Sequence, residues 1–144
     1  RRGGTRRWHR RRAVAPSPVA RRGTDRRILN HQSAVACRSA QATIESNALA
    51  DRVTVVRDDG LASQVDASAD LILFNPPFHS GAAVHSDTSI RLFEEAARVL
   101  TKGGELWVVA NRHLKYQQVL TGTIGPTREV SRSPKFTVTV STKA

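Results

Sequence analysis

The sequence predicts an α/β protein built around a mostly parallel sheet, and three observations support this fold class. From residue 27 onward, strand-like apolar runs alternate with amphipathic helical patterns, which is typical of strand–helix–strand units. The run at 71–74 is continuously apolar, as expected for a strand buried on both faces. Polar clusters follow three of the predicted strands, at the end where ligands bind in such sheets.

The first predicted elements are a strand, a helix and a second strand. Arg27–Asn30 gives the short first strand, and Ser33 is a suitable N-cap for a helix that Asn47 ends. One face of that helix carries Ala34, Cys37, Ala40 and Ile44. The β-branched run at 53–56 predicts the second strand, which two acids and a glycine close.

Three more strands and a second helix are predicted downstream. Residues 69–74 form the apolar strand, and residues 104–111 form another buried strand. Residues 87–100 form a helix whose inward face holds Ile90, Phe93, Ala96, Ala97 and Leu100. Residues 135–141 alternate strictly, which predicts a half-exposed antiparallel strand at or near an edge. Its two sides are Phe136, Val138 and Val140 against Thr137, Thr139 and Ser141.

Nearly all of the net charge of +11 belongs to one end of the 144-residue chain. Residues 1–29 hold eleven arginines and one acid, so the remainder is almost neutral. We expect residues 1–25 to be a disordered segment, with an RNA-binding arm as the alternative, and residues 26–144 to be the folded domain. Because the chain begins with Arg1, a fragment or a processed product is expected.

Cysteine usage and hydropathy indicate a cytoplasmic protein. Cys37 is the single cysteine, so an intramolecular disulfide framework is excluded. No apolar run approaches the roughly 20 residues of a membrane span. His79, His85 and His113 lack the spacing of metal ligands, so no metal site is expected.

The tetrapeptide Asn75-Pro76-Pro77-Phe78 ends the apolar strand abruptly, because proline has no N–H for the sheet. The Asn75 amide and the Pro76 carbonyl can both accept hydrogen bonds from one exocyclic amine. Such contacts orient the amine for attack on an electrophilic methyl group. The Phe78 ring offers a face on which a base can stack. The plain alternative is a turn that only ends the strand.

The segments NPPFH, GGELWVVANRHLKY and SPKF together resemble the class I, S-adenosylmethionine-dependent rRNA guanine-N2 methyltransferases of the methyltransferase small domain group. The resemblance covers about residues 27–141, the second half of the two-part enzymes of that family, and implies a Rossmann-like sheet with helices on both faces. It implies ribosomal RNA as the partner and S-adenosyl-L-methionine as the cofactor.

The resemblance also assigns roles to individual residues. Asn75, Pro76, Pro77 and Phe78 would form the target-amine site, with Asn75 close to the methyl donor. Asp59 would contact the adenine end of the cofactor, and Asp58 is the less favoured candidate. At the end of the preceding strand, His31 stands where the family has an acid that holds the ribose hydroxyls. An imidazole cannot reproduce a bidentate carboxylate.

A second departure from the family pattern concerns the start of the domain. The glycine-rich D-x-G-x-G loop and the mid-sheet first strand have no counterpart upstream of residue 26, where arginine-rich sequence stands instead. An out-of-frame reading of that region is one explanation. Two functions therefore stay open: an rRNA methyltransferase, or a catalytically inactive remnant that at best binds RNA. Methylation of DNA adenine or protein glutamine is a lesser alternative.

Overall fold

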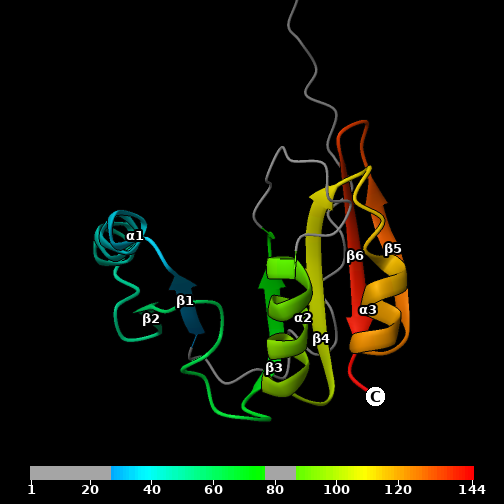
Figure 1. Ribbon diagram of the computed structural model, residues 1–144. Coiled ribbons are helices and arrows are strands. Elements are labelled where there is room, and N and C mark those ends of the chain that lie inside the picture. The colour runs from blue at the N-terminus through cyan, green and yellow to red at the C-terminus, as the bar shows by residue number, and fades with distance from the viewer. Residues whose placement is uncertain (1–26, 77–86) are drawn as a thin grey trace, which may run out of the picture.

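The computed structural model describes residues 27–76 and 87–144, which form two sheets with helices packed on them (Figure 1). Pro77, Phe78 and the predicted disordered segment 1–25 lie outside the described residues. The smaller sheet pairs β1 (Arg27–His31) with β2 (Val53–Arg57) in parallel. The larger sheet has the order β3-β4-β6-β5. Its strands are β3 (Ala69–Phe74), β4 (Leu100–Asn111), β5 (Thr127–Arg132) and β6 (Phe136–Thr142).

Strand direction and helix position confirm the predicted fold class. β3 and β4 run parallel, whereas β6 is antiparallel to both of its neighbours. The first helix, α1 (Ala34–Ser46), begins and ends where the sequence predicts. The Ser33 hydroxyl accepts a hydrogen bond from the Ala36 N–H at 3.4 Å, and Asn47 is the C-cap. Ile44 is the buried residue of this helix.

The main core lies between the larger sheet and two helices on one of its faces, α2 (Asp87–Val99) and α3 (Gln117–Thr123) (Figure 1). Phe93 of α2 is fully buried. Its ring meets Phe74 edge-to-face at 5.9 Å and Tyr116 at 5.1 Å. The Tyr116 hydroxyl donates a hydrogen bond to the buried Ser89 hydroxyl at 3.1 Å. The rest of the cluster comprises Ala96, Leu100, Leu106, Val108, Leu120 and Ile124.

Several expectations about burial are wrong in detail. β3 and β4 are not covered on both faces, since Leu73 is 75% exposed and Val109 is 40% exposed. The buried stripe of α2 includes Leu92 and Val99, whereas Ile90 is only half-buried. Leu100 is buried as predicted, but it begins β4. α3 and β5 were not predicted, because their short and mixed sequences carry weak periodicity.

Strand β6 is antiparallel and next to an edge, as predicted. The helices cover its hydroxyl-bearing face and not its apolar face. The hydroxyl face holds Ser141 at 0% and Thr139 at 8% exposed, and on the apolar face Val140 is also buried, at 3%. Ser141 and Thr139 pair with Leu106 and Val108 of β4, on the face that the helices cover. Phe136, on the apolar face of the strand, is 50% exposed. The helices therefore cover the hydroxyl face of this strand.

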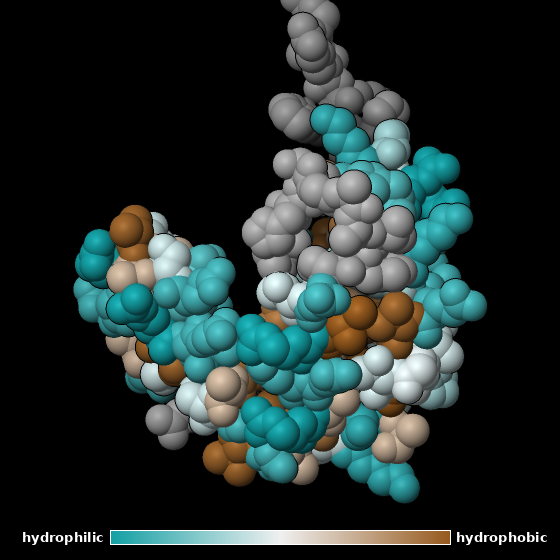
Figure 2. Space-filling view, viewed as in Figure 1, coloured by the Kyte–Doolittle hydropathy of each residue, from teal (hydrophilic) through white to brown (hydrophobic). Residues whose placement is uncertain are grey.

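Among the described strands, β1 pairs with β2 alone and β3 pairs with β4 alone. Figure 1 shows the β1–β2 sheet beside β3, with no described strand between them. In the space-filling view an open notch separates the part built by β1, β2 and α1 from the larger part (Figure 2). Within the described residues, the position of the expected mid-sheet strand is therefore unfilled.

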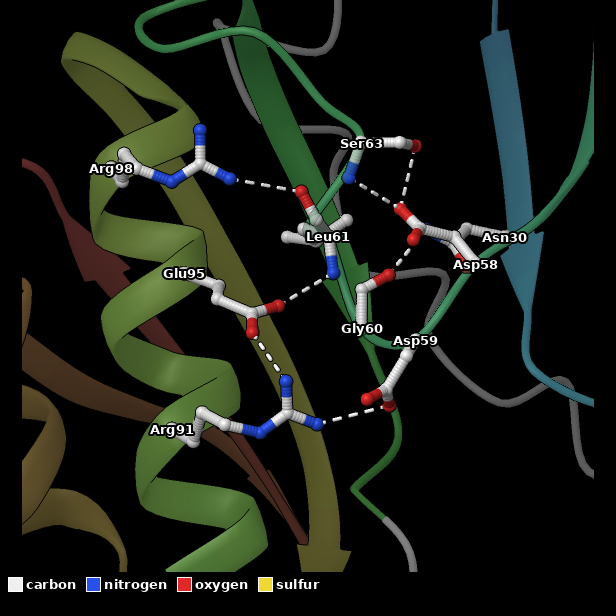
Figure 3. A network of polar contacts seen from close by, with 9 residues as sticks. All are labelled: Asn30, Asp58, Asp59, Gly60, Leu61, Ser63, Arg91, Glu95 and Arg98. Atoms are coloured by element: carbon white, nitrogen blue, oxygen red, sulfur yellow. Dashed lines mark hydrogen bonds and ion pairs between the residues drawn. The ribbon is translucent and has the colours of Figure 1, made fainter.

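A polar network joins the loop after β2 to α2, and so joins the smaller sheet to the larger one (Figure 3). The Glu95 carboxylate accepts hydrogen bonds from the Leu61 N–H and from the Arg91 guanidinium, each at 2.6 Å. The Arg98 guanidinium donates to the carbonyls of Leu61 at 2.9 Å and Gln64 at 2.8 Å. Polar backbone groups of the loop are thus paired with charged side chains of the helix. We call this set of contacts the α2–loop network.

Gly60 makes the close approach within the α2–loop network possible. Its φ of +69° lies in the left-handed region, which residues with a Cβ adopt at a cost. A Cβ at this position would lie 2.3 Å from the Glu95 carboxylate oxygen Oε2 and 2.5 Å from the Leu92 methyl group Cδ2. Backbone conformation and the limited space both favour glycine here.

We expect Gly60→Ala to lower the free energy of unfolding by about 2–3 kcal/mol, because a strained φ is added to displacement of the Glu95 side chain. Urea unfolding followed by circular dichroism measures this loss. Gly103→Ala is the matched control, since φ there is +78° but nothing lies within 4 Å of an added Cβ. The control should lose only about 1 kcal/mol. Equal losses in the two variants would contradict the role of the close approach.

Candidate functional site

The candidate site lies at the carboxyl edge of the parallel strands. β1 ends at Asn30 and His31, Asp58 and Asp59 follow β2, and Asn75 follows β3. Parallel pairing of β1 with β2, and of β3 with β4, brings the ends of each pair to one edge. Figure 1 shows β1 and β3 pointing the same way. Ligands of open α/β sheets bind beyond this edge.

The end of β3 holds Asn75 on a rigid support. Phe74, directly before it, packs edge-to-face against the fully buried Phe93. Pro76, directly after it, is buried and fixes its own backbone torsion. Asn75 itself is exposed, so its amide is available to a ligand and is not sealed in the core. Well-packed neighbours on both sides thus position an accessible polar side chain.

The Asp58 carboxylate forms hydrogen bonds within its own loop. It accepts hydrogen bonds from the Ser63 hydroxyl at 2.7 Å and from the Ser63 N–H at 2.9 Å (Figure 3). The Asn30 amide donates to the same carboxylate at 3.5 Å and to the Gly60 carbonyl. The Ser63 hydroxyl is the main cause of a lowered Asp58 pKa, which the backbone N–H groups of Ser63 and Asp59 and the Asn30 amide reinforce.

Asp59 differs from Asp58 because it points outward. Its side chain is 70% exposed, and it forms an ion pair with Arg91 at 3.0 Å. The hydrogen bond that the Arg91 guanidinium donates to Asp59, together with the nearby Glu95 charge, raises the pKa of Arg91. An open hollow of about 430 Å³ lies next to this carboxylate. Its lining consists of Gln32, Arg57, Asp58 and Asp59.

His31 takes a local structural role at the start of α1. Its ring nitrogen Nδ1 accepts a hydrogen bond from the Ser33 N–H at 2.9 Å, and the side chain is exposed. A nitrogen used in this way leaves only Nε2 for a ligand. The nearby polar residues that sequence reasoning missed are Asn30 and Gln32. The position of Asn30 at the end of an apolar strand was the signal that could have found it.

The end of β4 adds positive charge to the same edge of the larger sheet. Asn111 is half-buried, whereas Arg112 and His113 are exposed. The Arg112 backbone N–H donates to the Lys135 backbone carbonyl at 2.9 Å, so this strand end carries two exposed basic residues on adjoining backbone segments. Basic side chains at such an edge suit an anionic ligand.

The described residues hold neither a cluster of metal ligands nor a membrane-spanning helix. Within 27–76 and 87–144, no group of three or more His, Cys, Asp and Glu side chains could hold a metal ion. None of the helices in the described part of the chain is long and apolar enough to cross a membrane.

Comparison with known proteins gives a consistent result. The profile of the methyltransferase small domain family matches residues 17–140. "Ribosomal RNA large subunit methyltransferase G" of Streptomyces coelicolor is 43% identical over 116 residues, which are 81% of this chain and 31% of that protein. The protein of the same name from Stutzerimonas stutzeri is 49% identical over 86 residues, 60% of this chain and 23% of that protein.

Among solved structures, the T. thermophilus 16S rRNA N2 methyltransferase (RsmC), in complex with AdoMet and guanosine, superposes with a TM-score of 0.73. It is 27% identical, and the match covers 81% of this chain and 31% of that one. The fold is therefore the Rossmann-like fold of class I S-adenosylmethionine-dependent methyltransferases. The chain spans between a fifth and a third of the length of these three proteins.

The lowered pKa of Asp58 makes stability depend on pH. Its ordinary value is 3.8, and a lower value in the folded state means that the ionised form stabilises the fold. This contribution is complete above about pH 5 and is lost as the pH falls below about 3.8 toward the folded-state pKa. Between about pH 5 and 3, wild type should therefore lose more unfolding free energy than Asp58→Asn.

Ser63→Ala should move the Asp58 pKa up toward its ordinary value, because the strongest hydrogen bond to the carboxylate is removed. Titration of the side-chain carboxyl by NMR measures the shift. Ser46→Ala is the control, since that hydroxyl bonds to the Ala42 carbonyl of α1. Identical Asp58 titration in wild type and Ser63→Ala would show that this hydrogen bond is not formed in solution.

Proposed function

The chain belongs to the methyltransferase small domain family, and from this premise we propose that it acts in S-adenosylmethionine-dependent methylation of ribosomal RNA, at the exocyclic N2 of a guanine. The observation that carries the proposal is the exposed Asn75, held between Phe74 and Pro76 at the carboxyl end of β3. The relatives in Streptomyces coelicolor and T. thermophilus, both named as rRNA methyltransferases, support it.

The residues of the β3 end suit orientation of a weakly nucleophilic amine. The Asn75 side-chain oxygen and the Pro76 carbonyl would accept the two N–H bonds of the target amine and aim its lone pair outward. S-adenosylmethionine, when bound, supplies the electrophilic methyl group. A new N–C bond forms as the S–C bond breaks, and the amine then releases a proton to water. Fixed orientation of this kind supplies several kcal/mol of barrier reduction.

The hollow beside β2 suits the adenine end of the cofactor. Asp59 is exposed and its ion pair with Arg91 lies at the surface, so its carboxylate can accept a hydrogen bond from the adenine amine. Asp58 suits this role less, because hydrogen bonds from Ser63 and Asn30 converge on its Oδ2 atom and hold the carboxylate against its own loop. Arg112 and Lys135 would contact RNA phosphates, which position a nucleic acid without reading its sequence.

The second candidate is a remnant without catalytic activity that at best binds RNA. The observation that favours it is His31, whose Nδ1 is bonded to the Ser33 N–H at the position where the family has an acid for the ribose. A cofactor that lost this contact would bind more weakly. Methylation of DNA adenine or protein glutamine is the lesser alternative within the enzyme class.

Calorimetry with S-adenosylmethionine separates the two candidates. A dissociation constant in the micromolar range supports the enzyme, and no measurable heat at millimolar cofactor supports the remnant. Transfer of a labelled methyl group to naked ribosomal RNA then tests the substrate class. If DNA or a release factor is methylated and ribosomal RNA is not, the proposed substrate is wrong.

Asn75→Ala should lower methyl transfer to RNA by about a hundredfold or more, because the target amine loses one of its two acceptors. Asn75→Asp keeps an oxygen acceptor in nearly the same place and should retain much more activity than the alanine variant. Asn47→Ala is the control, since that amide only bonds to the Thr43 carbonyl at the end of α1. Equal activity of Asn75→Ala and wild type in single-turnover assays would refute the assigned role.

Asp59→Ala should weaken S-adenosylmethionine binding about tenfold, which is the effect of losing one charge-assisted hydrogen bond. Arg91→Ala removes the same ion pair but leaves the carboxylate free. It should therefore bind the cofactor as tightly as wild type or more tightly. Calorimetry compares the two variants, and equal weakening in both would mean that the ion pair, and not the carboxylate, supports binding.

A further inference from the structure

We propose that the end of β4 and the β5–β6 turn bind single-stranded RNA next to the target guanine. A neighbouring base stacks on Phe136, and the phosphates beside it contact basic side chains. The binding surface consists of Asn111, Arg112, Arg132, Lys135 and Phe136, and we call it the basic–aromatic surface. The inference rests on the proposed function and deepens it, because it assigns the RNA that flanks the reacting base to residues with no part in methyl transfer.

The first observation is the distribution of charge downstream of residue 57. Residues 111–136 hold five Lys and Arg residues against one acid, a net charge of +4. Residues 58–105, which include Asn75, hold three against eight, a net charge of −5. The one acid of the basic segment, Glu129, is paired with the Arg132 guanidinium at 2.7 Å. Attraction for an RNA backbone therefore comes from residues 111–136 and not from the chain around Asn75.

The second observation is that strand register brings this charge to the edge that holds Asn75. β4 runs parallel to β3 and antiparallel to β6, so Asn111 at the end of β4 pairs with Phe136 at the start of β6. The Arg112 backbone N–H donates to the Lys135 carbonyl at 2.9 Å. Figure 1 shows the β5–β6 turn at the same edge as the ends of β3 and β4. Two strand spacings, about 10 Å, separate β3 from β6, which suits a neighbouring nucleotide.

The third observation is an aromatic side chain with an open face. Phe136 is 50% exposed and lies on the face of the sheet opposite α2 and α3. Leu73 and Asn75 are exposed, whereas Phe74 between them packs on the core, so the Asn75 side chain points to that same face. An exposed ring beside basic side chains is the combination that binds single-stranded nucleic acid. The half-buried Asn111 lies next to the ring and can hydrogen-bond to the edge of the stacked base.

The turn that carries Lys135 and Phe136 is held in place by its own hydrogen bonds. The Ser133 N–H donates to the Phe136 carbonyl at 2.8 Å, and the Phe136 N–H donates to the Ser133 hydroxyl at 2.9 Å. Pro134 fixes its own backbone torsion within the turn. A preformed surface binds without the entropic cost of ordering a loop. The ligand is single-stranded RNA, since a base reaches Phe136 only when it is unstacked from its neighbours.

The test measures RNA binding without cofactor or methyl transfer, by fluorescence anisotropy of a labelled single-stranded RNA with one guanosine among uridines. Phe136→Ala should weaken binding about tenfold or more, because the stacked base loses its platform. Phe136→Trp keeps a ring and should retain the affinity of wild type. Phe136→Leu keeps an apolar side chain without a ring and should bind as weakly as the alanine variant. Circular dichroism checks that each variant is folded.

Salt dependence tests the basic side chains separately. Arg112→Ala and Lys135→Ala should each reduce the slope of log affinity against log salt concentration by about 0.7, the value for one phosphate contact on a single strand. Phe136→Ala should leave the slope unchanged. Lys102→Ala is the matched control, because Lys102 is also exposed but lies near the start of β4, at the opposite edge of the sheet. It removes the same charge and should leave the slope unchanged.

Three results would overturn the inference. They are equal affinity of Phe136→Leu and wild type, equal loss of slope in Lys102→Ala and Lys135→Ala, and tighter binding of duplex RNA than of single-stranded RNA. Methyl transfer to ribosomal RNA by wild type, combined with any of these results, would leave the proposed function standing without this inference. The expected binding pattern without methyl transfer would do the reverse.

Discussion

The α2–loop network is the constraint on which the geometry of the candidate site depends. No strand pairing joins the two sheets within the described residues, so the loop after β2 is fixed to the larger sheet through Glu95 and Arg98. The Glu95 side chain is only 15% exposed, and hydrogen bonds from backbone N–H groups to a shielded carboxylate are strong. Gly60 allows the approach. The position of Asp58 and Asp59 relative to Asn75 thus rests on contacts outside the site.

The same network contains one weak interaction, and that weakness suits a binding site. Arg91 contacts the half-buried Glu95 and also the exposed Asp59. Exposed ion pairs contribute about 0–1 kcal/mol, so Asp59 can exchange its partner for a ligand at little cost. Asp58 cannot, because three hydrogen bonds from Ser63 and Asn30 hold it. Two adjacent acids of identical chemistry therefore differ in their availability to a ligand, because their partners differ.

Elements with a local sequence pattern could be predicted from the sequence alone. α1 with its Ser33 cap, the strands β1 to β4 and the polar ends of those strands follow from periodicity and turn chemistry. The contacts that decide which acid is free, such as Ser63 to Asp58 and Arg91 to Asp59, join residues from separate elements. Alternation in β6 showed two distinct faces, but packing of α3, distant in the sequence, decides that Ser141 faces inward.

The two halves of the candidate site are supported by different amounts of buried apolar surface. The β3 end, with Asn75, rests on a core that includes the fully buried Phe93, Leu106 and Leu120. In residues 27–66, by contrast, Ile44 is the one apolar side chain below a tenth exposed. Local stability follows buried apolar contacts, so the β2 end opens more readily than the β3 end. The proposed target-amine site therefore lies in the stable part of the fold. The proposed cofactor hollow beside β2 depends instead on the α2–loop network.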